Sequence, residues 1–159
     1  VAGDSAGGNL AAVVALMARE AAGPSVALQG LLYPGTDMRM QSDSHSLYTE
    51  HLLLPDTMRW FREQYLRDES DLRDWRASPL LAERFDGLPP AYVMTAGFDP
   101  LRDEGKAYAE KLRAAGVPVA YRCYEGQIHG FLTLDKIIPE ALDALQDFAL
   151  AVKGVTGFE

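Results

Sequence analysis

Three residues far apart in the sequence, Ser5, Asp99 and His129, could together perform nucleophilic catalysis. A serine hydroxyl is a weak nucleophile, so it needs a base that takes its proton and a third group that orients the base. An imidazole and a carboxylate can supply those two functions. The order serine, aspartate, histidine is also the order in which one class of sheet-based hydrolases carries these groups.

The residues around Ser5 support this interpretation. Residues 3–7 read Gly-Asp-Ser-Ala-Gly, which fits the G-x-S-x-G pattern of a nucleophile held on a sharp turn between a strand and a helix. Glycine on both sides leaves room for a strained serine backbone. The next stretch, 9–20, predicts a helix because Leu10, Val13, Val14 and Met17 recur at helical spacing. Ser5 would then lie at a helix N-terminus, where free N–H groups favour a developing negative charge.

Each candidate also has a simpler interpretation. The glycine-rich pentapeptide fits a turn that caps a helix, Asp99 could cap a turn, and His129 could be a surface loop residue. Asp103 is a rival acid, but its place at a helix start favours capping. His45 and His51 lie in or beside a polar loop, where we expect solvated side chains.

The surrounding elements predict an α/β fold. Strands are expected at 26–33, 91–96 and 119–124, and residues 1–3 are expected to be the end of another strand. Helices are expected at 9–20, from Pro55 onwards, at 103–115 and at 139–152. The segments 36–50 and 125–130 are expected to be loops. Such alternation indicates a parallel sheet covered by helices on both faces. In open α/β sheets the chemistry lies at the carboxyl ends of the strands, where Ser5, Asp99 and His129 all fall. Arg122 indicates that the last strand is an edge strand.

Composition narrows the possible partners and the compartment. The chain has 159 residues, enough for one domain, and a net charge of −8 with scattered basic residues, which argues against nucleic acid or an anionic membrane surface as a partner. No apolar run approaches the roughly 18 residues of a membrane span. The single cysteine, Cys123, cannot form an internal disulfide, so we expect a cytoplasmic protein and a buried, unreactive thiol.

The first residues suggest that more of the domain lies upstream. The chain begins with Val1, and residues 1–3 resemble the last step of a strand. We therefore expect residues 1–159 to be the C-terminal portion of a single catalytic domain that starts at the nucleophile turn. A missing N-terminal segment or a companion chain could supply the remainder, and a homodimer could form through the last strand and helix.

Four motifs resemble the hormone-sensitive-lipase-like esterases of the α/β-hydrolase superfamily. They are Gly-Asp-Ser-Ala-Gly-Gly-Asn at 3–9, Gly-Leu-Pro-Pro at 87–90, Asp-Pro-Leu-Arg-Asp-Glu-Gly at 99–105 and His-Gly-Phe at 129–131. The resemblance implies a carboxylesterase that acts on small-molecule esters with short to medium acyl chains and needs no metal or organic cofactor. It implies that Ser5 is the nucleophile, Asp99 the orienting acid and His129 the general base. It also implies that the N–H of Ala6 is an oxyanion-hole donor.

The chain departs from that family in one respect. The family carries a His-Gly-Gly-Gly segment upstream of the nucleophile, which completes the oxyanion hole, and N-terminal helices that form a cap; the 159 residues contain neither. We therefore expect little or no esterase activity from this chain alone. A non-catalytic fragment or interaction module that retains the triad is one alternative, and an amidase, peptidase or lactonase on the same scaffold is another. Met38, Leu47 and residues 52–54 could line an acyl pocket, although packing explains the leucines equally well.

Overall fold

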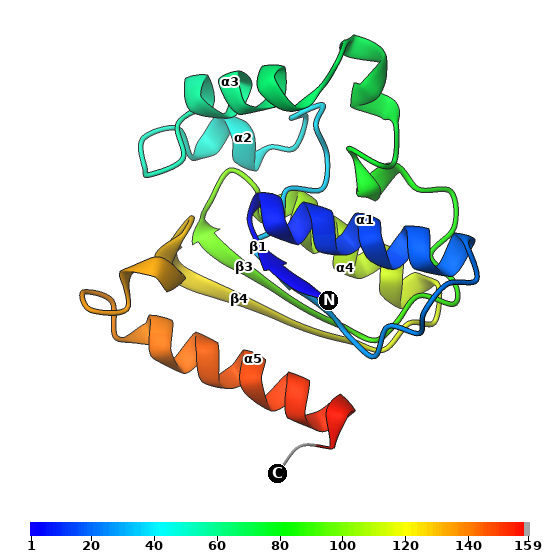
Figure 1. The fold of residues 1–159 in the computed structure, drawn as a ribbon. Helices are drawn as coiled ribbons and strands as arrows, with labels where there is room; N and C mark the ends of the chain where they lie inside the picture. Colours follow the sequence, from blue (N-terminus) through cyan, green and yellow to red (C-terminus); the bar gives the residue numbers. More distant parts are fainter. Residues whose placement is uncertain (158–159) are drawn as a thin grey trace.

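Four parallel strands form the central sheet of the protein (Figure 1). The computed structural model describes residues 1–157, and within them the strands lie in the order β1-β2-β3-β4. Their bounds are Ala2–Asp4 for β1, Gln29–Leu32 for β2, Ala91–Phe98 for β3 and Val119–Ile128 for β4. All neighbouring strands are parallel, and each crossover contains a helix. The predicted α/β fold is therefore confirmed.

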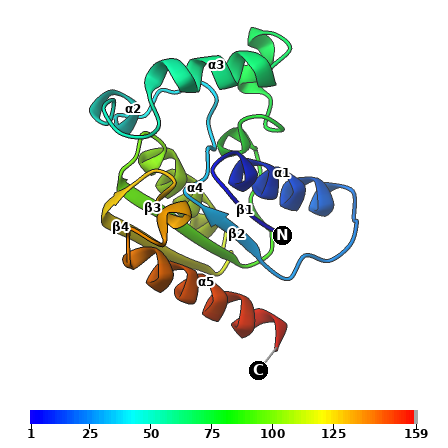
Figure 2. The same cartoon turned by 60° about the vertical axis from the view of Figure 1, so that its left-hand side comes forward.

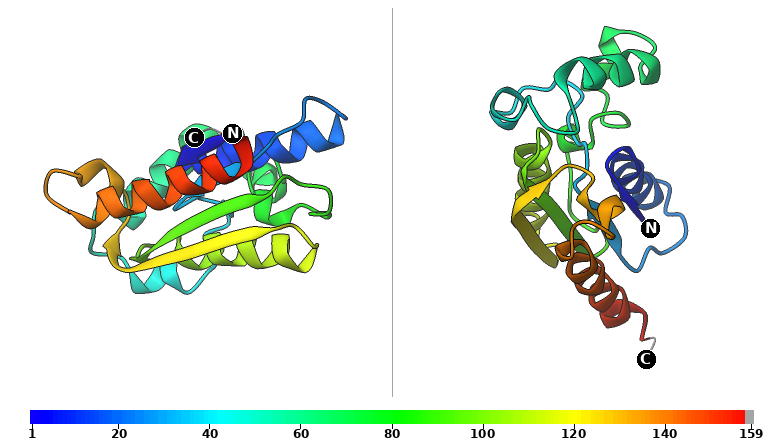
Figure 3. Two further views of the ribbon diagram at one scale, coloured as in Figure 1. Left: turned by 90° about the horizontal axis from the view of Figure 1, so that it is seen from below. Right: turned by 90° about the vertical axis from the view of Figure 1, so that its left-hand side faces the viewer.

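Helices cover both faces of this sheet (Figure 3). Helices α1 (Ala6–Glu20) and α4 (Arg102–Ala114) pack against one face, and α5 (Glu140–Thr156) packs against the other. On the α5 side, a Cβ atom at Gly30 of β2 would lie 2.5 Å from the Phe148 ring. The absence of a side chain at Gly30 thus lets α5 approach the sheet closely.

Helix α1 begins earlier and buries a different face than its apolar spacing suggests. It starts at Ala6 rather than at Asn9, directly after Ser5. Its buried face consists mainly of small residues: Ala11, Ala12, Ala15 and Leu16 are at most 5 % exposed. Three of the apolar residues on which the helix prediction rested are about half exposed: Leu10, Val14 and Met17. The helix was thus predicted correctly, whereas most of its predicted apolar face does not lie against the sheet.

Two helices lie beyond the carboxyl ends of the strands (Figures 1 and 2). Helix α2 (Ser44–Leu47) is one short turn inside the segment that was predicted to be a loop, and α3 (Pro55–Tyr65) begins at Pro55 as predicted. Within residues 1–157 there are also three short 3-10 helices, at Glu69–Arg73, Pro79–Leu81 and Phe131–Leu134. The carboxyl-end side of the sheet, where chemistry was expected, is thus overlaid by the α2–α3 region.

Strand β4 extends beyond its predicted end. Residues 125–128 were predicted to be loop but continue the strand, and Ile128 pairs with Phe98 after a register shift at Gly97. A Cβ atom at Gly97 would lie 2.0 Å from the Glu125 carbonyl oxygen, so the two backbones approach this closely only because Gly97 has no side chain. The bulge therefore lets pairing resume and carries the chain directly to residue 129.

The last strand of the described sheet is β4, as Arg122 predicted. The Arg122 guanidinium forms an ion pair with Asp147 of α5, which ties this helix to the edge strand. The neighbouring Cys123 is half-buried, and burial raises the pKa of its thiol, which disfavours the reactive thiolate. Across residues 1–157, no helix is long and apolar enough to cross a membrane.

Candidate active site

Ser5 lies at the tip of a sharp turn between β1 and α1. Its backbone has φ 51° and ψ −115°, and a positive φ is unfavourable for a residue with a side chain. The Ser5 N–H donates to the Leu32 carbonyl at 2.9 Å, and the Ser5 carbonyl accepts from the Asn9 N–H at 3.1 Å. The predicted strand, turn and helix around Ser5 are therefore present, and hydrogen bonds on both sides hold the strained residue.

The glycines of this turn are needed at different positions than the pattern suggests. A Cβ atom at Gly3 would lie 2.3 Å from the Gly7 backbone, so Gly3 meets the expected steric requirement. At Gly7, however, a Cβ atom would meet only an Asp4 oxygen at 3.8 Å, an ordinary contact. The second restricted position is instead Gly8, where a Cβ atom would lie 2.8 Å from Pro34. The expectation that Gly7 relieves crowding through its own missing side chain is therefore wrong.

Asp99 and His129 each lie directly after the end of one of two neighbouring strands. Phe98 and Ile128, the last residues of β3 and β4, are paired, and neighbouring strands lie about 5 Å apart. Asp99 and His129 directly follow this pair. The Asp99 side chain is fully buried and that of His129 is 9 % exposed. The extended β4 strand and its bulge thus bring the two side chains together.

The three side chains form one continuous hydrogen-bonded chain. The Ser5 Oγ atom lies 2.8 Å from His129 Nε2, and His129 Nδ1 lies 2.8 Å from Asp99 Oδ2. The other Asp99 oxygen accepts from the Leu101 N–H at 2.8 Å. An ionised carboxylate can only accept, so Nδ1 carries the proton and Nε2 is left to accept from the serine hydroxyl. This arrangement suits an imidazole that removes the proton from Ser5.

Aromatic packing and a glycine turn fix the His129 ring. The ring packs against Tyr33 in a T-shaped arrangement, with 5.0 Å between the ring centroids. Gly130 follows with φ 75°, a left-handed conformation that glycine adopts readily, and the next residue, Phe131, is fully buried. The chain therefore reverses immediately after His129 and is anchored there, which restricts the imidazole to one region of the site.

The N–H of Ala6 belongs to the first turn of α1. The first N–H groups of a helix have no intrahelical acceptor, and no acidic side chain occupies the first turn of α1. The positive end of the helix dipole therefore lies beside Ser5. An oxygen that becomes negative next to Ser5 would be stabilised at this position.

Two of the remaining predictions are wrong. His45 was expected to be solvated, yet its side chain is 7 % exposed and its Nε2 atom lies 2.7 Å from Glu104 Oε2. Asp103 was expected to cap its own helix, yet it accepts from the Ser44 N–H of α2 at 2.9 Å. His51 is exposed as predicted. The sequence marks Glu104 only as an acidic residue near the N-terminus of its helix. No local pattern indicates that its side chain is buried.

The residues proposed to line an acyl pocket differ in how far they are exposed and how near they lie to the site. Leu52 is near the site, since a Cβ atom at Gly130 would lie 3.4 Å from its Cδ2 atom. Leu47 and Leu54 are 63 % and 44 % exposed. A pocket role for them stays a prediction. In the described part of the chain, no group of three or more His, Cys, Asp or Glu residues is placed to hold a metal ion.

Comparison with known proteins gives consistent matches. A family model described as alpha/beta hydrolase fold matches residues 1–133. The carboxylic ester hydrolase LipN of Mycobacterium tuberculosis is 53 % identical over 140 residues, which cover 84 % of this chain and 37 % of LipN. The ethyl acetate hydrolase of Pseudomonas putida is 40 % identical over 149 residues, which cover 91 % of this chain and 46 % of that enzyme.

A solved structure matches the whole architecture. The ester-hydrolase from the metagenome of Lake Arreo, in complex with a bipyridine phosphonate derivative, superposes with a TM-score of 0.95 and 46 % identity. The match covers 99 % of this chain and 50 % of that protein. The chain thus spans about half the length, or less, of the relatives that it matches.

Proposed function

The chain belongs to the alpha/beta hydrolase family, in agreement with its resemblance to hormone-sensitive-lipase-like esterases, and on this basis we propose that it carries the catalytic triad of a serine carboxylester hydrolase. The observation that supports this proposal most is the relay from Ser5 through His129 to the buried Asp99, with 2.8 Å at each step. Relatives named as ester hydrolases favour an ester substrate over an amide or a lactone.

The proposed reaction transfers an acyl group to water in two stages. His129 Nε2 takes the Ser5 proton while Oγ attacks the ester carbonyl, and the resulting oxyanion is stabilised by the Ala6 N–H and the N-terminus of α1. The imidazolium gives its proton to the leaving alcohol as the carbon–oxygen bond breaks, which leaves an acyl group on Ser5. Water then attacks this acyl-enzyme with the help of His129, releases the carboxylic acid and restores the serine.

Asp99 has two functions in this scheme. Its carboxylate keeps the proton of the neutral imidazole on Nδ1, so that Nε2 can accept, and it stabilises the imidazolium that forms. Its second oxygen is held by the Leu101 N–H, which prevents rotation of the carboxylate. The buried acid is therefore both oriented and electrostatically effective.

The 159-residue chain is expected to hydrolyse p-nitrophenyl acetate slowly, because it contributes only one of the proposed oxyanion donors. In hydrolases of this fold, the N–H after the nucleophile acts together with an N–H from an upstream loop. Removing one such donor lowers kcat by about 10²–10³. A chimera in which the part of LipN that lies ahead of its matched segment is fused before Val1 should therefore be faster by at least that factor.

The matched control is the same chimera with Ser5→Ala, which should lose the gain. Equal rates for the 159-residue chain and the chimera would contradict the proposed division of the oxyanion hole. A gain that persists without the serine hydroxyl would show that the fused segment, rather than Ser5, is responsible.

A further inference from the structure

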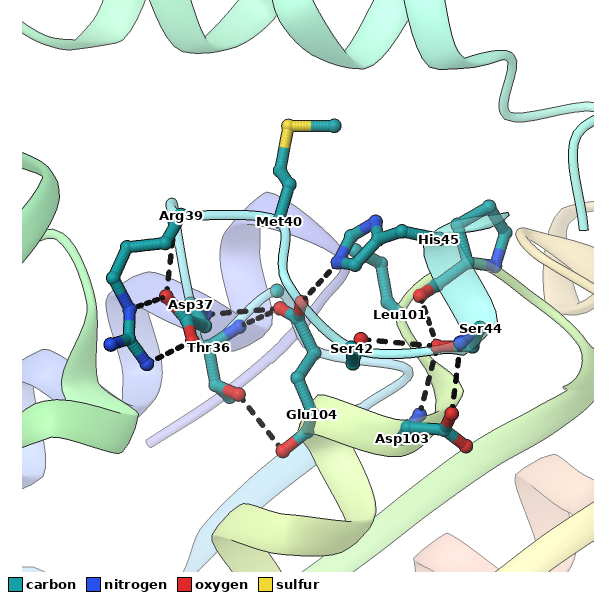
Figure 4. A network of polar contacts seen from close by, with 12 residues as sticks. Thr36, Asp37, Arg39, Met40, Ser42, Ser44, His45, Leu101, Asp103 and Glu104 are labelled. Atoms are coloured by element: carbon teal, nitrogen blue, oxygen red, sulfur yellow. Dashed lines mark hydrogen bonds and ion pairs between the residues drawn. The ribbon is translucent and has the colours of Figure 1, made fainter. Parts of the chain in front are cut away.

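A buried carboxylate outside the triad holds the segment that follows β2. Glu104 lies in the first turn of α4 and is 2 % exposed. Its Oε1 atom accepts from the backbone N–H groups of Thr36 at 2.5 Å and Asp37 at 3.0 Å, and its Oε2 atom contacts His45 Nε2 at 2.7 Å (Figure 4). One side chain thus joins both ends of segment 36–45 to α4.

A buried charge of this kind is tolerated only when it is well satisfied. Burial raises the pKa of the Glu104 carboxyl above its ordinary value, and its contacts with His45, Thr36 and Asp37 oppose that rise. Beside it, the Asp37 carboxylate forms an ion pair with Arg39 at 2.7 Å (Figure 4). Two backbone N–H groups and a ring nitrogen of His45 therefore converge on Glu104 inside a compact polar cluster, which fixes the path of the segment.

The same segment is joined to the turn that carries Asp99. The Ser44 hydroxyl donates to the Pro100 carbonyl at 2.6 Å. The Ser44 N–H donates to Asp103 at 2.9 Å (Figure 4). Pro100 follows Asp99 directly, and Asp103 precedes Glu104 on α4. Two independent connections, one from Glu104 and one from Ser44, therefore couple segment 36–45 to residues that follow Asp99 in the turn and at the start of α4.

We propose that Glu104, with His45, is a positioning residue that docks segment 36–45 on the start of α4 and thereby holds the Asp99 turn in the geometry that orients His129. The proposal rests on the proposed function, because it concerns the orienting acid of the triad. Neither Glu104 nor His45 touches Ser5 or His129 in this arrangement. Their effect passes through Ser44 and Pro100 to the carboxylate of Asp99.

The test uses two spectroscopic measurements on the chain without substrate. Amide hydrogen exchange at Thr36 and Asp37 reports whether the segment is docked, and the far-downfield proton resonance of His129 Nδ1–H reports the hydrogen bond to Asp99. Glu104→Ala should speed exchange at both amides by about tenfold or more and should shift or broaden the His129 resonance. Glu104→Gln, which keeps an acceptor oxygen, should restore both signals towards those of the unaltered chain.

The matched control is Glu110→Ala on the exposed side of the same helix, which should leave both signals unchanged. Faster exchange in Glu104→Ala with an unaltered His129 resonance would overturn the proposal, since the segment would then be held without positioning Asp99. Should Glu104→Ala fail to fold, Ser44→Ala removes the hydroxyl that contacts the Pro100 carbonyl, the Asp103 N–H and the Ser42 hydroxyl, and it leaves the hydrogen bond from the Ser44 N–H to Asp103 in place. In that variant a changed His129 resonance supports the proposal, and an unchanged one overturns it.

These measurements do not depend on turnover. If ester hydrolysis by the chimera proves independent of Ser5, the proposed function fails, whereas the docking of segment 36–45 and its effect on the His129–Asp99 hydrogen bond are still measured. The two proposals can therefore fail separately.

Discussion

Replacing Ser5 by alanine is expected to lower kcat for p-nitrophenyl acetate by about 10⁶-fold in the LipN chimera. The substitution removes the atom that lies 2.8 Å from His129 Nε2 and that forms the acyl bond in the proposed mechanism. His129 and Asp99 then have no nucleophile to activate. The remaining rate would come only from binding and from the oxyanion donors.

The fold should survive this substitution, because the backbone hydrogen bonds of the turn do not use the hydroxyl. The circular dichroism spectrum and the unfolding midpoint should therefore stay close to those of the unaltered chain. Ser25→Ala, at an exposed serine before β2, is the matched control and should leave kcat unchanged. A Ser5→Ala chimera that retains most of its activity would exclude Ser5 as the nucleophile.

Replacing Asp99 by asparagine is expected to lower kcat by about 10⁴-fold. The asparagine oxygen can still accept from the Leu101 N–H, so its amide NH₂ group faces His129 Nδ1. His129 Nδ1 must then accept a hydrogen bond from this amide, so the imidazole proton moves to Nε2. A protonated Nε2 cannot take the proton of Ser5. The geometry is retained, while the tautomer of the base becomes the wrong one.

Steady-state kinetics on the chimera tests this expectation, with KM measured alongside kcat. The loss should fall on kcat, since Asp99 does not contact the substrate. Asp86→Asn, in an exposed ion pair with Arg84, is the matched control and should change neither constant. A decrease of only a few-fold in Asp99→Asn would mean that another group orients His129, and the role assigned to Asp99 would be wrong.

Much of this site could be predicted because its residues follow the sheet. Parallel strands all end at the same edge, so residues directly after predicted strands are expected to meet there. That reasoning predicts that Ser5, Asp99 and His129 lie together, and the three side chains are hydrogen-bonded in series. Their catalytic roles stay predictions until they are measured.

The long-range details could not be predicted from local patterns. The bulge at Gly97 depends on a backbone in another strand, so nothing near residues 125–128 distinguishes a continued strand from a loop. His45 was assigned to solvent because its neighbours are polar, yet its ring turns inwards and contacts Glu104. A buried ion-paired network has no sequence period, since its members come from separate elements and are polar like any loop.

Labelling of the 159-residue chain with a p-nitrophenyl phosphonate ester tests most directly whether His129 and Asp99 activate Ser5 as a nucleophile. Intact-mass analysis and peptide mapping locate the adduct and give its rate of formation. We expect one phosphonyl group, on Ser5, which is absent in Ser5→Ala and forms at least about 10²-fold more slowly in His129→Gln. Labelling at another residue, or an equal rate in His129→Gln, would contradict this expectation.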